Sequence, residues 1–424
     1  MSDRTVTLLL AEIVLEEPWA IRAPEVGGPL DAPVARDGFG NLYVPPASVA
    51  GALRAHLASE GLADQLMGPR TVANDETLSA SPLRVVGTDL SEASPSLRQR
   101  TAIDRDRGAA AARTLRVQEL VEPGARVTVY LRHDGPLPDA GLAALCSWQP
   151  RLGGGASEGQ GRGRLESLRY GVIDLDTPEG LTLWLTKGGR SLHREVCQTS
   201  CSPEDLEQAS GHDQSPLIEA GLTIADALLI GVESPEDRVS AEPLTRQGTP
   251  VVDGASLKGL LRSRAEYILR SLGHDACRGV TAGKACGRCG ACELFGAPDR
   301  LGLLSIASST IQQPTVEKRS HVAIDRVTGG AAEEEGLLFT ERVVTSGTLT
   351  LCIEARRPVP TWGRLLLLHV LRDIHDGLVG LGRGTTRGQG TLSLTDPSLL
   401  AELDDGQPSL VEALKDGAPQ ESTS

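Results

Sequence analysis

Four cysteines in the second half of the chain have the spacing of a metal site. They are Cys277, Cys286, Cys289 and Cys292, in the pattern C-x8-C-x2-C-x2-C. Tight C-x2-C turns bring thiolates together as tetrahedral Zn²⁺ requires, and four sulfur ligands leave no open position for a substrate. We therefore expect a structural zinc site that folds an insertion over residues 274–300. The run C-x2-C-x2-C also opens like an iron–sulfur motif, but no Cys-Pro follows at the expected offset, so zinc is favoured.

A glycine-rich pattern, L-G-x-G-x-x-x-G-Q-G, occurs twice, at residues 152–161 and 381–390. Glycine lets the backbone turn and approach a ligand without a Cβ, so several backbone N–H groups can meet a phosphate chain there. Neither loop ends in the Lys-Ser or Lys-Thr of a P-loop, and neither lies between a strand and a helix as a dinucleotide fingerprint does. The pattern therefore disfavours nucleotide hydrolysis.

Two further motifs recur in the same order. Residues 48–54 (S-V-A-G-A-L-R) match residues 256–262 (S-L-K-G-L-L-R), and A-I-D-R occurs at 102–105 and at 323–326. A period of roughly 210 to 230 residues is far too long for a solenoid unit, so each copy is expected to be a whole domain. The chain is therefore interpreted as a tandem duplication.

The serine of the S-x-x-G-x-L-R motif stands where a helix N-cap would, ahead of an apolar stripe at helical spacing. The positive end of such a helix can bind an anion, and Arg54, Lys258 and Arg262 would add charge to it. Helix capping and surface ion pairs explain the same residues equally well, so both interpretations stay open.

Helix and strand patterns are mixed in both halves, with long returns between them, which is typical of an α+β fold. Long polar insertions at roughly 60–100 and 274–320 are expected to project from the domains. Strands are predicted at 5–15, 127–131 and 348–352, and helices at 139–147 and 361–376, ahead of the two glycine loops. The predicted domains are 1–186 and 216–403, with a linker or insertion at 187–215 and a flexible acidic tail at 404–424.

The formal net charge of −14 argues against a free-standing, non-specific nucleic-acid binder, although arginines gather between residues 98 and 116. No apolar run reaches the ~18 residues that a membrane span needs. The first residues lack the pattern of a secretory signal. We therefore expect a cytoplasmic protein with no membrane partner.

Several of these motifs resemble those of the RAMP superfamily, in particular the backbone subunits of type III CRISPR effector complexes. The first copy carries D-A-P-V-A-R-D at 31–37, the S-x-x-G-x-L-R helix start and Ile103-Asp104-Arg105. The second copy adds D-G-A-S-L-K-G-L-L-R at 253–262, L-F-G at 294–296 and F-T-E at 339–341. The resemblance covers nearly the whole chain, and two such domains in one polypeptide are similar to the fused subunits of type III-D systems.

This resemblance implies an RRM-like (ferredoxin-like) fold in each half and binding to CRISPR RNA, target single-stranded RNA and other type III effector subunits. Each domain would push a β-hairpin thumb, drawn from its insertion, between guide and target. An aspartate ahead of the motif helix would cleave the target with Mg²⁺ or Mn²⁺, and the matching residue is Asp31. A carboxylate there can act as a base or hold the metal ion near the scissile phosphate.

The resemblance further implies RNA contacts for basic, hydroxyl and glycine residues of both copies. They are Arg36, Ser48, Arg54, Arg105, Gly153, Gly155, Gly159, Gly161, Arg246, Ser256, Lys258, Arg262, Arg326, Gly382, Arg383, Gly384, Arg387, Gly388 and Gly390.

The second copy departs from the pattern at the cutting position. Aligning A-E-P-L-T-R at 241–246 with D-A-P-V-A-R at 31–36 puts Ala241 in the place of Asp31, and Glu242 and Asp237 are the nearby carboxylates for a second site. A non-catalytic scaffold for the guide and a metal-cluster redox protein remain the alternatives. Guide processing is disfavoured because neither copy has a histidine beside its glycine loop at a matching position.

Overall fold

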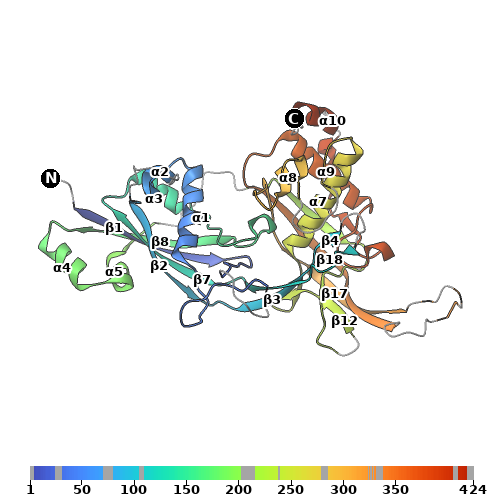
Figure 1. The fold of residues 1–424 in the computed structure, drawn as a ribbon, viewed down its shortest axis with the longest axis horizontal. Coiled ribbons are helices and arrows are strands. Elements are labelled where there is room, and N and C mark those ends of the chain that lie inside the picture. Colours follow the sequence, from blue (N-terminus) through green and yellow to red (C-terminus); the bar gives the residue numbers. More distant parts are fainter. Residues whose placement is uncertain are drawn as a thin grey trace. The chain divides into compact units, whose positions relative to one another are not determined.

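The computed structural model of the chain separates into two compact units, each described here by itself (Figure 1). The first comprises Met1–Arg100, Arg116–Ala156 and Gln160–Gln214, and the second comprises Thr101–Leu115, Ser157–Gly159 and Ser215–Ser424. The structure describes residues 4–23, 31–69, 80–104, 109–201, 215–236, 239–277, 285–322, 324, 327, 329–330, 338–403 and 409–417.

The first unit is built on an antiparallel sheet with the strand order β2-β7-β1-β8-β9. Helix α1 (Pro46–Ser59) connects the first two core strands, and helix α3 (Asp139–Cys146) connects the last two. The strands are β1 (Thr5–Leu15), β2 (Leu83–Ser91), β7 (Arg126–Asp134), β8 (Gly163–Asp174) and β9 (Thr199–Ser200). This βαββαβ order, with the first core strand between the third and the fourth, is the predicted ferredoxin-like fold.

Successive side chains of strand β1 point to opposite faces of the sheet, and both faces are covered. Leu9, Ala11 and Ile13 belong to the core beneath α1 and α3, whereas Leu8 and Leu10 belong to a smaller cluster on the other face. Helices α4 (Pro178–Thr186) and α5 (Gly189–Val196) contribute to that second cluster. Such double coverage explains why β1 reads as an almost continuous apolar run.

The second unit repeats this order. Its four equivalent strands are arranged β15-β18-β10-β19, with antiparallel pairing throughout. Helix α7 (Gly254–Ser271) follows β10, and helix α9 (Thr361–His375) follows β18. The strands are β10 (Ile218–Ile224), β15 (Leu304–Ile306), β18 (Leu338–Ala355) and β19 (Leu392–Leu394). Two tandem domains of one α+β fold are therefore confirmed.

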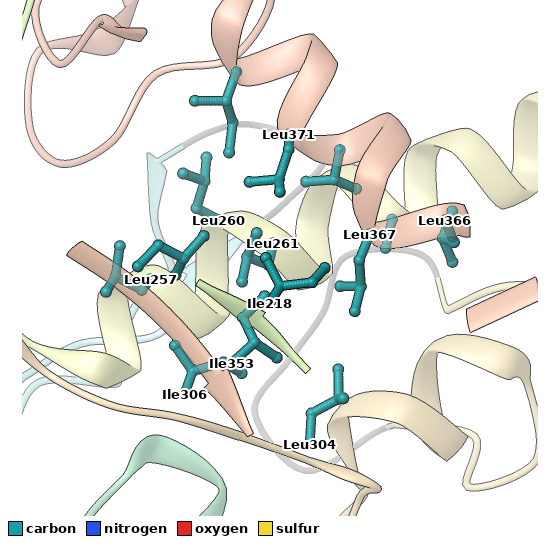
Figure 2. Close-up of a cluster of buried hydrophobic side chains, with 14 of the residues drawn as sticks. Ile218, Leu257, Leu260, Leu261, Leu304, Ile306, Ile353, Leu366, Leu367 and Leu371 are labelled. Atoms are coloured by element: carbon teal, nitrogen blue, oxygen red, sulfur yellow. The ribbon is translucent and has the colours of Figure 1, made fainter. Parts of the chain in front are cut away.

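Leucine and isoleucine side chains from α7, α9 and the sheet fill the core of the second unit (Figure 2). The apolar stripe of α7 (Leu257, Leu260, Leu261) faces Ile306 and Ile353 of the strands. Spacing at i, i+3 and i+4 places the three leucines on one side of the helix, so the sequence pattern alone predicts this face.

A β-hairpin rises from each unit around the Ile-Asp-Arg motif. In the first copy β3 (Pro95–Arg100) pairs with β6 (Arg116–Val121), and in the second β17 (Gln312–Val322) pairs with the first half of β18. The short strands β4 (Ile103–Asp104) and β5 (Ala109–Ala110) pair with each other in the segment Thr101–Leu115, which groups with the second unit. The insertion at 60–100 was expected to supply the thumb, but it also holds helix α2 (Ala63–Met67) and core strand β2.

The remaining elements lie beside these hairpins and helices. Strand β12 pairs in parallel with β18, and helix α8 lies inside the cysteine-rich insertion. Their bounds are β11 (Gly231–Val232), β12 (Val239–Pro243), β13 (Thr245–Arg246), β14 (Thr249–Val252), β16 (Ser309–Thr310), α8 (Gly290–Phe295) and α10 (Leu410–Gly417).

Three local expectations need correction. The helices start before the predicted serines, because Pro45 and Asp253 are the N-caps, and the Asp253 side chain accepts a hydrogen bond from Ala255 N–H. The segment 187–215 begins with α5 and β9, which pack on the first unit. The tail contains α10, whose residues Leu410, Ala413 and Leu414 are buried in the second core because they share one helical face.

Candidate functional site

The two glycine loops make the same backbone hydrogen bonds in the two units. In the first, Gly154 N–H donates to Ala20 O at 3.0 Å and Gly161 N–H donates to Pro18 O at 2.9 Å. In the second, Arg383 N–H donates to Leu229 O at 2.8 Å and Gly390 N–H donates to Ala227 O at 2.6 Å. Each loop is thereby fixed to the segment that follows the first core strand, and these N–H groups are not available to a phosphate.

Backbone geometry explains why the pattern requires glycine. Gly161 and Gly390 have φ values of 75° and 80°, and a Cβ on either would lie 2.0 Å from the carbonyl oxygen of the leucine that opens its loop. Gly153, Gly155, Gly159, Gly382, Gly384 and Gly388 also have positive φ. The left-handed conformation disfavours L-residues, so the repeated glycines are a requirement of the fold itself.

Asp31 lies exposed beside β6 of the first hairpin, near the end of the β3–β6 pairing that is further from the core sheet. Its N–H donates to Val117 O at 3.1 Å, and its Oδ2 accepts the Val117 N–H at 2.7 Å. These two bonds fix the carboxylate against β6. Among the residues that the structure describes, no side chain bonds the second oxygen, Oδ1, and the residue as a whole is exposed. A fixed and exposed carboxylate has the geometry needed to hold a cation or take a proton.

Strand pairing identifies the residue of the second unit that corresponds to Asp31. In the first unit Trp19, which follows the first core strand, forms an antiparallel bridge with Val121. In the second unit Leu228 forms the equivalent bridge with Val344. Three residues before these valines, Gln118 and Glu341 pair in parallel with Ala32 and Ala241.

Ala32 therefore corresponds to Ala241, and Asp31 corresponds to Ser240. The alignment of Asp31 with Ala241 was wrong by one residue. Four residues separate Asp31 from Arg36 in the first copy, whereas five separate Ser240 from Arg246 in the second. Ser240 Oγ donates to Thr340 O at 3.2 Å.

The two carboxylates considered for a second cutting site do not take the place of Ser240. Glu242 lies two residues beyond it, accepts a hydrogen bond from Ser234 Oγ at 3.1 Å and lies 4.0 Å from Arg342. Asp237 lies outside the described residues, as do Arg105 and Arg326.

Arg54 and Arg262 occupy equivalent positions of the motif helices and make equivalent intramolecular contacts. Arg54 donates to Gly68 O at the end of α2, and Arg262 Nη1 donates to Gly296 O at the end of α8 at 2.7 Å. Both glycines end their short helices with positive φ. Both arginines were predicted to contact RNA, but here their charge satisfies helix C-terminal carbonyl groups.

Lys258 is also engaged inside the protein. Its Nζ donates to Ser157 Oγ at 2.7 Å, and Ser157 belongs to the short segment grouped with the second unit. Burial lowers the pKa of Lys258. A lysine held in this way is not presented to solvent as a phosphate ligand.

The other predicted contacts vary in exposure. Arg36 is half-exposed and pairs with the buried Glu119 at 2.5 Å. Arg383 pairs with Glu341 at 3.0 Å and keeps half of its surface exposed, and Arg387 is exposed. Ser48 and Ser256 lie partly buried in the first turns of α1 and α7, and Arg246 lies partly buried in β13.

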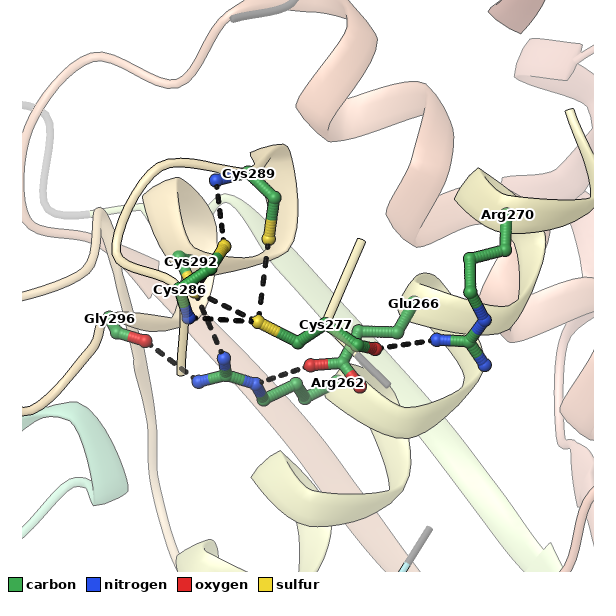
Figure 3. A network of polar contacts seen from close by, with 8 residues as sticks. All are labelled: Arg262, Glu266, Arg270, Cys277, Cys286, Cys289, Cys292 and Gly296. Atoms are coloured by element: carbon green, nitrogen blue, oxygen red, sulfur yellow. Dashed lines mark hydrogen bonds and ion pairs between the residues drawn. The ribbon is translucent and has the colours of Figure 1, made fainter. Parts of the chain in front are cut away.

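The four predicted metal ligands converge, as Figure 3 shows. All four Sγ atoms lie within 4.8 Å of one another, and Cys277 Sγ lies 3.5 Å from Cys292 Sγ and 3.8 Å from Cys289 Sγ. A tetrahedral site with Zn–S bonds of about 2.3 Å separates its sulfurs by about 3.8 Å. The thiolates of an iron–sulfur cluster are further apart because several iron ions lie between them. The cluster can therefore hold one metal ion such as zinc.

Hydrogen bonds surround these sulfurs. Cys286 N–H donates to Cys277 Sγ at 3.2 Å, and Cys289 N–H donates to Cys286 Sγ at 3.3 Å. Arg262 Nη2 lies 3.3 Å from Cys292 Sγ and balances part of the negative charge that four thiolates would carry (Figure 3). In the absence of metal, the neighbouring Cys292 and burial raise the pKa of Cys289 to about 12.

The comparisons with known proteins agree with this architecture. The family model of the RAMP superfamily matches residues 12–166 and 177–393, one stretch in each half of the chain. The chain belongs to the RAMP superfamily. RAMP proteins bind CRISPR RNA within CRISPR complexes, so the chain is a CRISPR-associated RNA-binding protein. No curated protein matches it significantly. No helix among the described residues of this RAMP protein is long and apolar enough to cross a bilayer.

The RAMP fold brings together residues that the motifs did not single out. Val117 supplies the amide that fixes Asp31, and His321 lies opposite Phe339 across the second hairpin. Only the pairing register connects these partners, and the register of a hairpin cannot be read from its strands taken separately.

Proposed function

We propose that this RAMP protein is a backbone subunit of a type III CRISPR ribonucleoprotein and cuts complementary target RNA with Asp31 as its catalytic residue. The observation that carries the proposal is the position of this carboxylate, exposed and bonded to strand β6 of the first hairpin through Val117. Target single-stranded RNA, the CRISPR RNA and other effector subunits would be the partners.

The chemistry follows from a nucleotide displaced beside the hairpin. Its 2′-OH attacks the adjacent phosphorus, the P–O5′ bond breaks, and the products carry a 2′,3′-cyclic phosphate and a 5′-OH. The Asp31 carboxylate either takes the 2′ proton or holds the divalent ion that takes up the developing charge. The 5′ oxygen receives a proton from water.

A bound Mg²⁺ or Mn²⁺ would stabilise negative charge on the phosphate. Among the described residues, no group of three or more histidine, cysteine or acidic side chains converges except the four cysteines. An ion at Asp31 would therefore take most of its ligands from RNA phosphates and water, which suits Mg²⁺.

The test is target cleavage by the assembled complex with Asp31→Asn. This variant keeps the side-chain shape and removes the charge, so the rate at its cut site should fall about 100-fold or more. Asp37→Asn is the matched control, because Asp37 is partly exposed and its carboxylate, among the described residues, accepts hydrogen bonds from its own turn at Phe39 and Asn41. Guide binding should be unchanged in both variants. Undiminished cleavage by Asp31→Asn would leave a guide scaffold as the function.

The scaffold role is favoured for the second domain by one observation. Ser240 stands where the first domain has Asp31, and a serine hydroxyl at neutral pH neither binds a divalent ion strongly nor accepts a proton readily. We propose that the second domain holds guide RNA without cutting.

A further inference from the structure

An aromatic pair stands near the loop end of the second hairpin, next to the last pair of its strands, Val322 and Leu338. His321 and Phe339 lie directly opposite each other on β17 and β18, and their rings stack with centroids 5.0 Å apart and planes 24° apart. The Arg387 guanidinium carbon, from the glycine loop, lies 5.8 Å from the centre of the Phe339 ring. Three groups with flat, polarisable surfaces are thus gathered at one point of the second unit.

A buried carboxylate holds this group in place. Glu341, two residues beyond Phe339 on the same face of β18, is fully buried. Its Oε1 lies 3.0 Å from Arg383 Nε, and its Oε2 lies 3.5 Å from His321 Nε2. A buried carboxylate is costly unless it is paired, so Glu341 restrains Arg383 and the imidazole of His321.

The pair itself is not part of a core. Both rings are only partly buried, and Arg387 is exposed and makes no ion pair with any residue that the structure describes. The whole chain has three phenylalanines, and aromatic residues are 3% of it. A partly exposed phenyl ring beside Arg387 of the glycine loop is therefore better explained by a ligand than by packing.

The first hairpin differs at the same two positions. Counting from the parallel bridges, Arg116 corresponds to Phe339, and its cross-strand partner Arg100 corresponds to His321. Two arginines can bind phosphate but offer no aromatic surface. A stacking site would therefore belong to the second domain alone.

We propose that His321 and Phe339 form a stacking platform for one unpaired base of bound single-stranded RNA. The base would lie on the Phe339 ring beneath Arg387, whose guanidinium covers its other face, and the exposed part of Arg383 would contact the adjacent phosphate. Stacking on aromatic rings and on arginine is how proteins hold unpaired bases with little regard to sequence. This inference rests on RNA binding by the chain and does not require that the chain cuts RNA.

The first test uses the full chain and a labelled single-stranded oligouridine. Phe339→Leu, which keeps an apolar side chain but removes the ring, should weaken binding about 5- to 100-fold, and Phe339→Trp should bind as well as the unaltered protein. Tyr267→Leu is the matched control, because Tyr267 is an exposed ring in the same unit with Arg264 4.4 Å above it, away from the hairpin. This control should bind normally.

Photocrosslinking provides a measurement that does not depend on the folding of a variant. Oligouridine with 5-iodouridine, irradiated with the unaltered protein, should crosslink to Phe339 or His321, as identified by mass spectrometry. Binding without such a crosslink, and with Phe339→Leu within twofold of the unaltered protein, would overturn the platform. Failure of the full chain to bind RNA at all would instead overturn the proposed function.

Discussion

At the residue scale, the two domains differ in one hydrogen bond that the segment before the motif helix makes with a hairpin strand. Asp31 accepts the Val117 N–H, whereas Ser240 donates to the Thr340 carbonyl oxygen. The two positions correspond because the parallel bridges one residue further on, at Ala32 and Ala241, are equivalent, although the pairing of β12 with β18 shifts register at Ser240. The presence or absence of a carboxylate is therefore the chemical difference on which cutting would depend.

Ser240→Asp tests this difference by gain of function. An aspartate there would lie beside the second hairpin as Asp31 lies beside the first, so the assembled complex should produce an additional cleavage product. We expect this product to form more slowly than the original one, because the residues around Ser240 are not arranged to support an aspartate in catalysis. Denaturing gels of end-labelled target would show it, and Ser240→Ala is the control that should add none.

Arg262 belongs to the folding of the cysteine insertion rather than to RNA. It bonds Gly296 O, Cys292 Sγ and the buried Glu266, to which its Nε lies 2.8 Å. Arg262→Met should lower the free energy of unfolding by about 3 to 5 kcal/mol, because it removes the cation that pairs with the buried Glu266 carboxylate.

The double variant Arg262→Met with Glu266→Leu should recover part of that loss, since the buried carboxylate is removed together with its cation. Urea denaturation of the three proteins would measure both effects. Equal stability of all three would contradict the structural role of the arginine.

Individual contacts were the part that the sequence predicted least well. Arg54 and Arg262 have the spacing of phosphate ligands at a helix start, yet their partners are carbonyl groups 14 and 34 residues further along the chain. A long side chain reaches whatever the fold brings near it, and a linear motif does not contain that information. The convergence of the four cysteines was predicted correctly, because the ligands of one metal ion must lie close together whatever the surrounding fold.

At the scale of elements, each glycine loop is hydrogen-bonded to the segment that follows the first core strand of its domain. Gly390→Ala should destabilise the second domain by well over the ~1–2 kcal/mol that the left-handed conformation alone costs, because its Cβ would meet Leu381 O at 2.0 Å. Gly388→Ala is the control, with φ of 83° and open space around its Cβ. Urea unfolding midpoints should fall steeply for Gly390→Ala and slightly for Gly388→Ala.

The cysteine insertion should depend on its metal. We expect one zinc ion per chain by elemental analysis, no visible colour, and loss of that ion in Cys286→Ser, because a four-sulfur site would lose a ligand. Cys352→Ser, outside the cluster, should keep the ion. Removal of the metal by a strong chelator should make residues 285–300 accessible to protease. A brown protein containing iron would contradict this account.

Elements with a strong apolar period were predicted nearly to the residue. The helices predicted at 139–147 and 361–376 are found at Asp139–Cys146 and Thr361–His375, and the first strand is found at Thr5–Leu15. Helix α10 was missed, because the acidic composition of the tail concealed its short apolar stripe. The order of the strands came from the family resemblance, since periodicity alone does not specify which strands are neighbours.

At the scale of the whole molecule, the chain is a duplication in which the two copies have diverged around one shared framework. Both domains keep the βαββαβ order and the hydrogen-bonded glycine loop. Both also keep the arginine that donates to the carbonyl group at the end of the next helix. They differ in the carboxylate, in the aromatic pair and in the metal site. The net charge of −14 requires that RNA be held by local basic groups, so binding should weaken steeply with salt.

The most direct test is a map of cleavage products at single-nucleotide resolution from the assembled complex. The account predicts that Asp31→Asn removes the cut made by this subunit and that Ser240→Ala removes none, while both variants retain guide and target. Loss of a product with Ser240→Ala, or an unchanged set of products with Asp31→Asn, would contradict it.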